Sequence, residues 1–83
     1  MRPNEDVDIA RRRQLRFYVS RKEKRGAPWT KTFATEDIDL ALERARTEAD
    51  YEVAVFVETA TGGFIYWTSK RPDVFNSSVL EIE

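Results

Sequence analysis

Apolar and polar residues alternate with a period of two in four segments of the 83-residue chain: residues 14–22, 29–34, 53–58 and 64–69. In the first segment Leu15, Phe17 and Val19 share one side, and the residues between them share the other. A period of two is typical of strands that bury one face. The alternation therefore predicts four β-strands.

The segments between the predicted strands differ in character. Residues 21–28 form a charged loop that closes with glycine and proline, and Gly62-Gly63 makes a tight turn because glycine adopts positive φ readily. Residues 36–50 instead place apolar residues on one stripe at helical spacing, with Thr35 as the expected N-cap. We therefore expect two hairpins joined by a helix.

The predicted fold is α+β: a single small ββαββ domain, with a four-stranded antiparallel sheet and one helix packed on one face. A right-handed β–α–β crossover gives the strand order 2-1-3-4, in which every neighbouring pair runs antiparallel. Residues 14–70 form this core. Residues 1–13 are expected to be a flexible or short helical arm, and residues 71–83 a tail or a short extra strand.

A lone helix covers one face of such a sheet, so the alternation also assigns residues to faces. The predicted inward set is Leu15, Phe17, Val19, Val53, Val55, Val57, Ile65 and Trp67. The outer face would then carry Tyr18, Phe56 and either Phe64 or Tyr66. An uncovered aromatic patch of this kind marks an interaction surface. The competing interpretation is that apolar residues between Val74 and Ile82 fold back over it.

The amino-acid composition excludes several kinds of metal site and active site. The chain has no cysteine and no histidine, which excludes thiolate metal sites and every catalytic arrangement that needs an imidazole. The carboxylates at Glu36, Asp37 and Asp39 suit a helix N-terminus better than a metal site. We therefore expect no enzyme activity, no cofactor and no metal. No apolar run approaches a membrane span and the N-terminus does not resemble a signal peptide, so we expect a cytoplasmic protein.

The net charge of −1 hides a concentration of cations in residues 11–31. One interpretation is that these cations neutralise phosphates while Tyr18 or Trp29 stacks on bases. The other interpretations are a solvated loop, an edge strand protected by lysine and arginine, and charge balance against the acidic helix. The residues are Arg11, Arg12, Arg13, Arg16, Arg21, Lys22, Lys24, Arg25 and Lys31.

We therefore expect a non-enzymatic interaction module that binds a protein partner, in the manner of small accessory or inhibitory proteins of phages and mobile elements. The alternative is a nucleic-acid-binding domain that uses the basic arm and the first hairpin. A homodimer is also compatible with so small a core. The expected partner-binding residues are Arg11, Arg12, Arg13, Arg16, Tyr18, Arg21, Lys22, Lys24, Arg25, Trp29, Phe56 and Tyr66.

Overall fold

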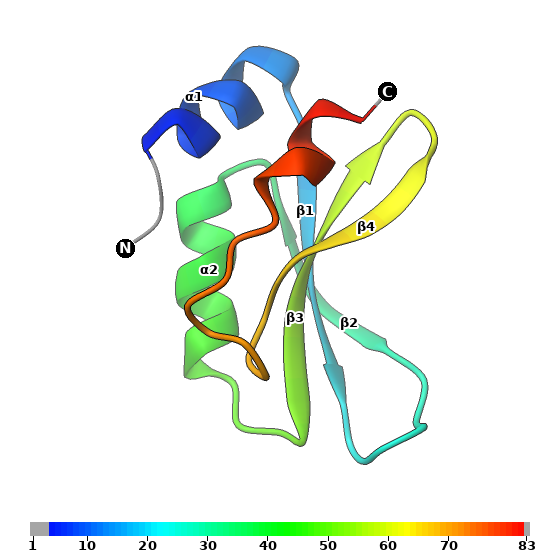
Figure 1. Cartoon of the computed structure of the whole chain (residues 1–83). Helices are drawn as coiled ribbons and strands as arrows, with labels where there is room; N and C mark the ends of the chain where they lie inside the picture. Colours follow the sequence, from blue (N-terminus) through cyan, green and yellow to red (C-terminus); the bar gives the residue numbers. More distant parts are fainter. Residues whose placement is uncertain (1–3, 83) are drawn as a thin grey trace.

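The computed structural model describes residues 4–82, which form one antiparallel sheet with its helices on one side (Figure 1). Its elements are α1 (Asn4–Arg13), β1 (Arg16–Lys22), β2 (Thr30–Thr35), α2 (Ile38–Thr47), β3 (Glu52–Thr59), β4 (Gly62–Thr68) and the 3₁₀ helix η1 (Ser77–Glu81). The strand order is β2-β1-β3-β4, and all three pairs are antiparallel. The α+β class and the four-stranded antiparallel sheet are confirmed. The one-helix ββαββ description is wrong, because α1 precedes the first strand.

Local sequence explains where α1 begins and ends. Two acids stand in its first turn and three arginines in its last, and both placements are favourable in the field of the helix dipole. Gln14 adopts a positive φ of 53°, and the amides of Gln14 and Leu15 donate to the carbonyls of Arg11 and Ala10, respectively. This hydrogen-bond pair is a Schellman motif, which ends the helix and turns the chain into β1.

The helix α2 buries the stripe that the sequence predicts, with Ile38, Ala41 and Leu42 among its buried residues. Its N-cap is Asp37, whose carboxylate accepts from the amides of Asp39 and Leu40 at 2.9 and 3.3 Å. The expectation of Thr35 as the N-cap is wrong by two positions.

A β-bulge between β3 and β4 changes which residues face the helices. Val55 pairs with Trp67 but Phe56 pairs with Ile65, so Tyr66 is the extra residue. Tyr66 and Trp67 are consequently both buried, at 1% and 3% exposure, while Ile65 is 37% exposed. Two sequence-based assignments are therefore wrong. Ile65 does not face the core, and neither Tyr66 nor Phe64 is on the outer face, since Phe64 pairs with buried Val57 and packs against the core.

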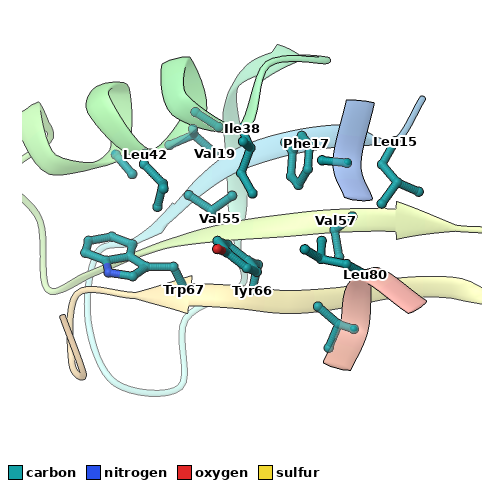
Figure 2. Packing of buried hydrophobic residues seen from close by; sticks show 14 of the residues in the cluster. Leu15, Phe17, Val19, Ile38, Leu42, Val55, Val57, Tyr66, Trp67 and Leu80 are labelled. Carbon is teal, nitrogen blue, oxygen red and sulfur yellow. The ribbon is translucent and has the colours of Figure 1, made fainter. Parts of the chain in front are cut away.

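The C-terminal segment packs on the same side of the sheet as the helices. Val79 and Leu80 of η1 join the core, and Figure 2 shows Leu80 beside Val57 of β3. Before η1, the Asn76 amide donates to the Tyr66 carbonyl at 2.9 Å and so occupies part of the free edge of β4. The interpretation that this segment covers the outer face is therefore wrong. Within residues 4–82, no helix is long and apolar enough to cross a membrane.

Candidate interaction surface

The sheet surface opposite the helices, here called the outer face, carries three half-buried aromatic residues. Tyr18 on β1 lies directly opposite Phe56 on the neighbouring strand β3. Trp29, just before β2, sets its ring against Phe56 in an edge-to-face contact, with centroids 5.2 Å apart and planes at 80°. We call Tyr18, Trp29 and Phe56 the aromatic cluster. It spans the two central strands and the start of the edge strand.

Two lysines rest on the rings of the aromatic cluster. The Lys31 ammonium lies 4.0 Å from the Tyr18 ring centroid, and the Lys22 ammonium lies 4.6 Å from the Trp29 centroid. Exposed cation–π contacts of this kind contribute about 0.5–1 kcal/mol each. Among residues 4–82, no carboxylate lies within ion-pair distance of either ammonium.

A groove of about 660 Å³ runs from the aromatic cluster to the turn between β3 and β4. Its lining includes all three aromatic residues, Lys31 and the turn residues from Thr59 to Gly63. The turn is held by the Thr59 hydroxyl, which accepts from the Thr61 amide and donates to the Gly62 carbonyl. The outer face is therefore hollowed, with an aromatic wall on one side and a fixed turn on the other.

Glu58 gives the groove a negatively charged end. The Tyr18 hydroxyl donates to its carboxylate at 3.2 Å. Desolvation raises the pKa of Tyr18, the Glu58 charge and hydrogen bond raise it further, and Arg16 opposes them. The outer face thus presents cations near the β1–β2 loop and a carboxylate near the β3–β4 turn.

The structure separates the cationic residues that the sequence groups together. Arg11, Arg12 and Arg13 lie on the last turn of α1, in the helical layer. There the Arg13 guanidinium donates to the backbone carbonyls of Leu80 and Ile82. These three arginines therefore lie on the helical side of the sheet and not with the aromatic cluster.

The remaining predicted cations divide into paired and unpaired groups. Arg16 pairs with Glu36 at 3.7 Å, and Arg21 pairs with Asp50 at 3.0 Å. Lys24 and Arg25 are exposed in the loop between β1 and β2. Lys22 and Lys31 are the residues of the predicted basic set whose ammonium groups lie on rings of the aromatic cluster within the described chain.

Three predicted aromatic site residues lie together and one does not. Tyr18, Trp29 and Phe56 form the cluster, whereas Tyr66 is buried against α1. The expected partner-binding residues left out Glu58, and they left out Lys31 although it belongs to the predicted basic segment. A signal for Lys31 was present, since alternation puts it on the same side of the second strand as Trp29.

Comparison with known proteins adds no assignment. No protein-family model matches the chain, and neither a curated protein nor a solved structure matches it significantly. Within residues 4–82, no three acidic side chains gather as a metal-binding group.

Proposed function

We propose that the protein is a non-enzymatic interaction module that binds a protein partner through the outer face. The observation that carries this proposal is the aromatic cluster beside a groove, on the side of the sheet opposite both helices and η1. Tyrosine, tryptophan and phenylalanine are enriched in the cores of protein interfaces. A half-buried aromatic patch at the surface of so small a domain is accordingly a candidate binding site.

The charges around the cluster support a protein partner over a polyanion. Lys22 and Lys31 stand near one end of the groove and Glu58 near the other, so the rim carries both signs. The arginines of α1 lie on the helical side of the sheet, which leaves few cations beside the aromatic cluster to neutralise phosphates. A mixed rim around an aromatic centre is the usual anatomy of a protein interface.

Capture from a lysate of the native host tests the proposal. The immobilised protein is compared with Phe56→Asp and Trp29→Ala, and with Leu40→Asp as a control, because Leu40 is 44% exposed on α2. Circular dichroism and a thermal melt establish that each variant folds. The capture is run from untreated lysate and from lysate treated with nuclease beforehand.

We expect at least one protein to be retained by the wild type and by Leu40→Asp but lost from both outer-face variants. The proposal fails if every captured protein is retained by Phe56→Asp and Trp29→Ala. It also fails if nuclease treatment abolishes all capture, because the partner would then be a nucleic acid or be bridged by one.

A nucleic acid is the second candidate partner, and one observation favours it. The two lysines on the rings lie near the exposed Lys24 and Arg25, so one end of the outer face is locally cationic. A single strand could stack bases on the cluster while these cations contact phosphates. Fluorescence anisotropy with labelled dT12 at several salt concentrations tests it, since phosphate contacts produce a steep loss of affinity with salt.

The proposal includes a cytoplasmic location. It is also compatible with a homodimer. A fluorescent fusion in the native host tests the location, and a signal confined outside the cytoplasm would contradict it. Light scattering at two protein concentrations tests the homodimer, which a constant monomer mass excludes.

A further inference from the structure

The cations around the sheet fall into two classes that differ in their partners. Arg16, Arg21 and Arg44 each lie within 3.0 to 3.9 Å of a carboxylate oxygen. Lys22 and Lys31 have aromatic rings as partners instead, and no carboxylate in the described chain reaches them. The two cations on the aromatic cluster are therefore available to an anion from outside.

A ring contact does not use up the hydrogen-bonding capacity of an ammonium group. Each lysine has three N–H donors, and the contact with a ring engages one side of the group. A carboxylate can therefore bind while the cation stays over the ring. Such a charge-assisted hydrogen bond is roughly twice as strong as a neutral one.

The carboxylates of the outer face are already engaged. Glu58 accepts from the Tyr18 hydroxyl, and Glu52 accepts from the Thr68 hydroxyl at 2.6 Å. In the loop beside Lys22, Glu23 is the single acid among exposed cations. Glu52 lies directly opposite Lys22 across the β1–β3 pair but forms no ion pair with it. The end of the groove near this loop therefore carries more cations than acids, and neither Lys22 nor Lys31 has a carboxylate partner in the described chain.

We propose that the partner presents an acidic segment, whose carboxylates bind Lys22 and Lys31 and whose apolar side chain enters the groove against Phe56. This inference rests on the proposed function, and it names the chemistry of the partner. Charge complementarity with the unpaired lysines supports the acidic residues. The aromatic wall of the groove supports the apolar anchor.

The position of Glu58 favours an acidic protein segment over a nucleic-acid strand. Glu58 lines the same groove as Lys31. A strand with a phosphate at every nucleotide would bring negative charge towards this carboxylate, which costs free energy. A protein segment can place carboxylates over the lysines and neutral residues beside Glu58.

Titration with defined probes tests the inference on the intact protein. The probes are the peptide acetyl-Glu-Glu-Leu-Glu-Glu-amide, the same peptide with glutamine in place of glutamate, and the oligonucleotide dT5. The readout is the chemical shift of the Trp29 indole and of the backbone amides of Lys31 and Phe56. The variants are Lys22→Glu/Lys31→Glu and, as the matched control, Lys70→Glu, because Lys70 lies 3.7 Å from the ring of Tyr51 in the same kind of contact elsewhere.

We expect saturable shifts with the glutamate peptide, at least fivefold weaker binding of the glutamine peptide, and loss of binding in the double variant but not in Lys70→Glu. The inference is overturned if the glutamate peptide gives no saturable shift up to millimolar concentration, or if the glutamine peptide binds equally well. Tighter binding of dT5 than of the glutamate peptide also overturns it, in favour of a nucleic acid.

The capture experiment separates failure of this inference from failure of the proposed function. If Phe56→Asp loses a partner that Lys22→Glu/Lys31→Glu retains, the outer face binds a protein, but the inference that this protein presents an acidic segment is wrong. If Phe56→Asp retains every partner, the outer face is not the binding surface. Loss of the same partner from both variants supports both proposals.

Discussion

The Tyr66 hydroxyl donates to Oδ2 of Asp6 at 2.6 Å, a contact that joins β4 to α1 across 60 positions of the chain. The Ser77 hydroxyl donates to the same oxygen at 2.8 Å. One buried carboxylate thus connects α1, β4 and η1 on the helical side of the sheet. These contacts hold both terminal segments away from the outer face.

Tyr66→Phe tests this connection. It removes the hydroxyl donor while keeping the ring, and it leaves the Asp6 carboxylate, which is 1% exposed, with fewer hydrogen bonds. We expect the free energy of unfolding to fall by about 1–3 kcal/mol, the usual cost of an incompletely paired buried polar group. Urea denaturation measures it. Tyr51→Phe is the control, because Tyr51 is 42% exposed, and an equal loss there would contradict the account.

Leu80→Ala tests whether η1 belongs to the core. Leu80 is fully buried in the cluster that includes Phe17 and Ala10, so truncation leaves a cavity. We expect a loss of about 2–5 kcal/mol in the free energy of unfolding. Leu40→Ala, on the exposed side of α2, should change it by less than about 0.5 kcal/mol. A loss at Leu80 no larger than at Leu40 would show that η1 does not pack as described.

The two glycines of the β3–β4 turn should respond differently to alanine. Gly62 has a φ of +142°, a backbone conformation that residues with a side chain rarely adopt, whereas Gly63 has no such constraint. We expect Gly62→Ala to cost about 1–3 kcal/mol through backbone strain and Gly63→Ala to cost much less. Thermal melts of the pair measure the difference, and equal melting temperatures would contradict the described turn.

Glu58→Gln should lower the pKa of Tyr18. In the wild type, desolvation raises this pKa, and the Glu58 charge and hydrogen bond add to the shift. Glutamine removes the negative charge, so the phenolate forms at lower pH than in the wild type. Titration of ¹³Cζ-labelled tyrosine by NMR measures the pKa, with Glu52→Gln as the control. An unchanged Tyr18 pKa in Glu58→Gln would show that the two side chains do not interact.

Alternation along the sequence predicts the sheet because most of its strand residues keep strict periodicity. Phe17, Val19, Val53, Val55 and Val57 all face the core as expected. The prediction breaks at Ile65 and Tyr66, because the extra residue in β4 reverses the faces of the positions before it relative to the simple alternation, whereas Trp67 beyond it faces the core as predicted. Nothing in the local pattern marks this bulge, since both residues are apolar enough for either face.

The structure of the terminal segments could not be predicted from the sequence, because contacts with distant residues determine it. Residues 4–13 read equally well as a frayed arm, because the contacts that fix α1 come from distant positions, such as Tyr66 and Leu80. The candidate site was partly predictable. Tyr18 and Phe56 follow from alternation, whereas the contact of Trp29 with Phe56 depends on how the β1–β2 loop returns to the sheet.

The most direct test of the binding surface is amide hydrogen exchange, with and without the partner recovered by capture. We expect slower exchange on binding in residues 18–31 and 56–63, with α2 unchanged, because the outer face lies opposite the helical layer. Protection confined to α1, α2 or η1, with the outer face exchanging as in the free protein, would contradict the account.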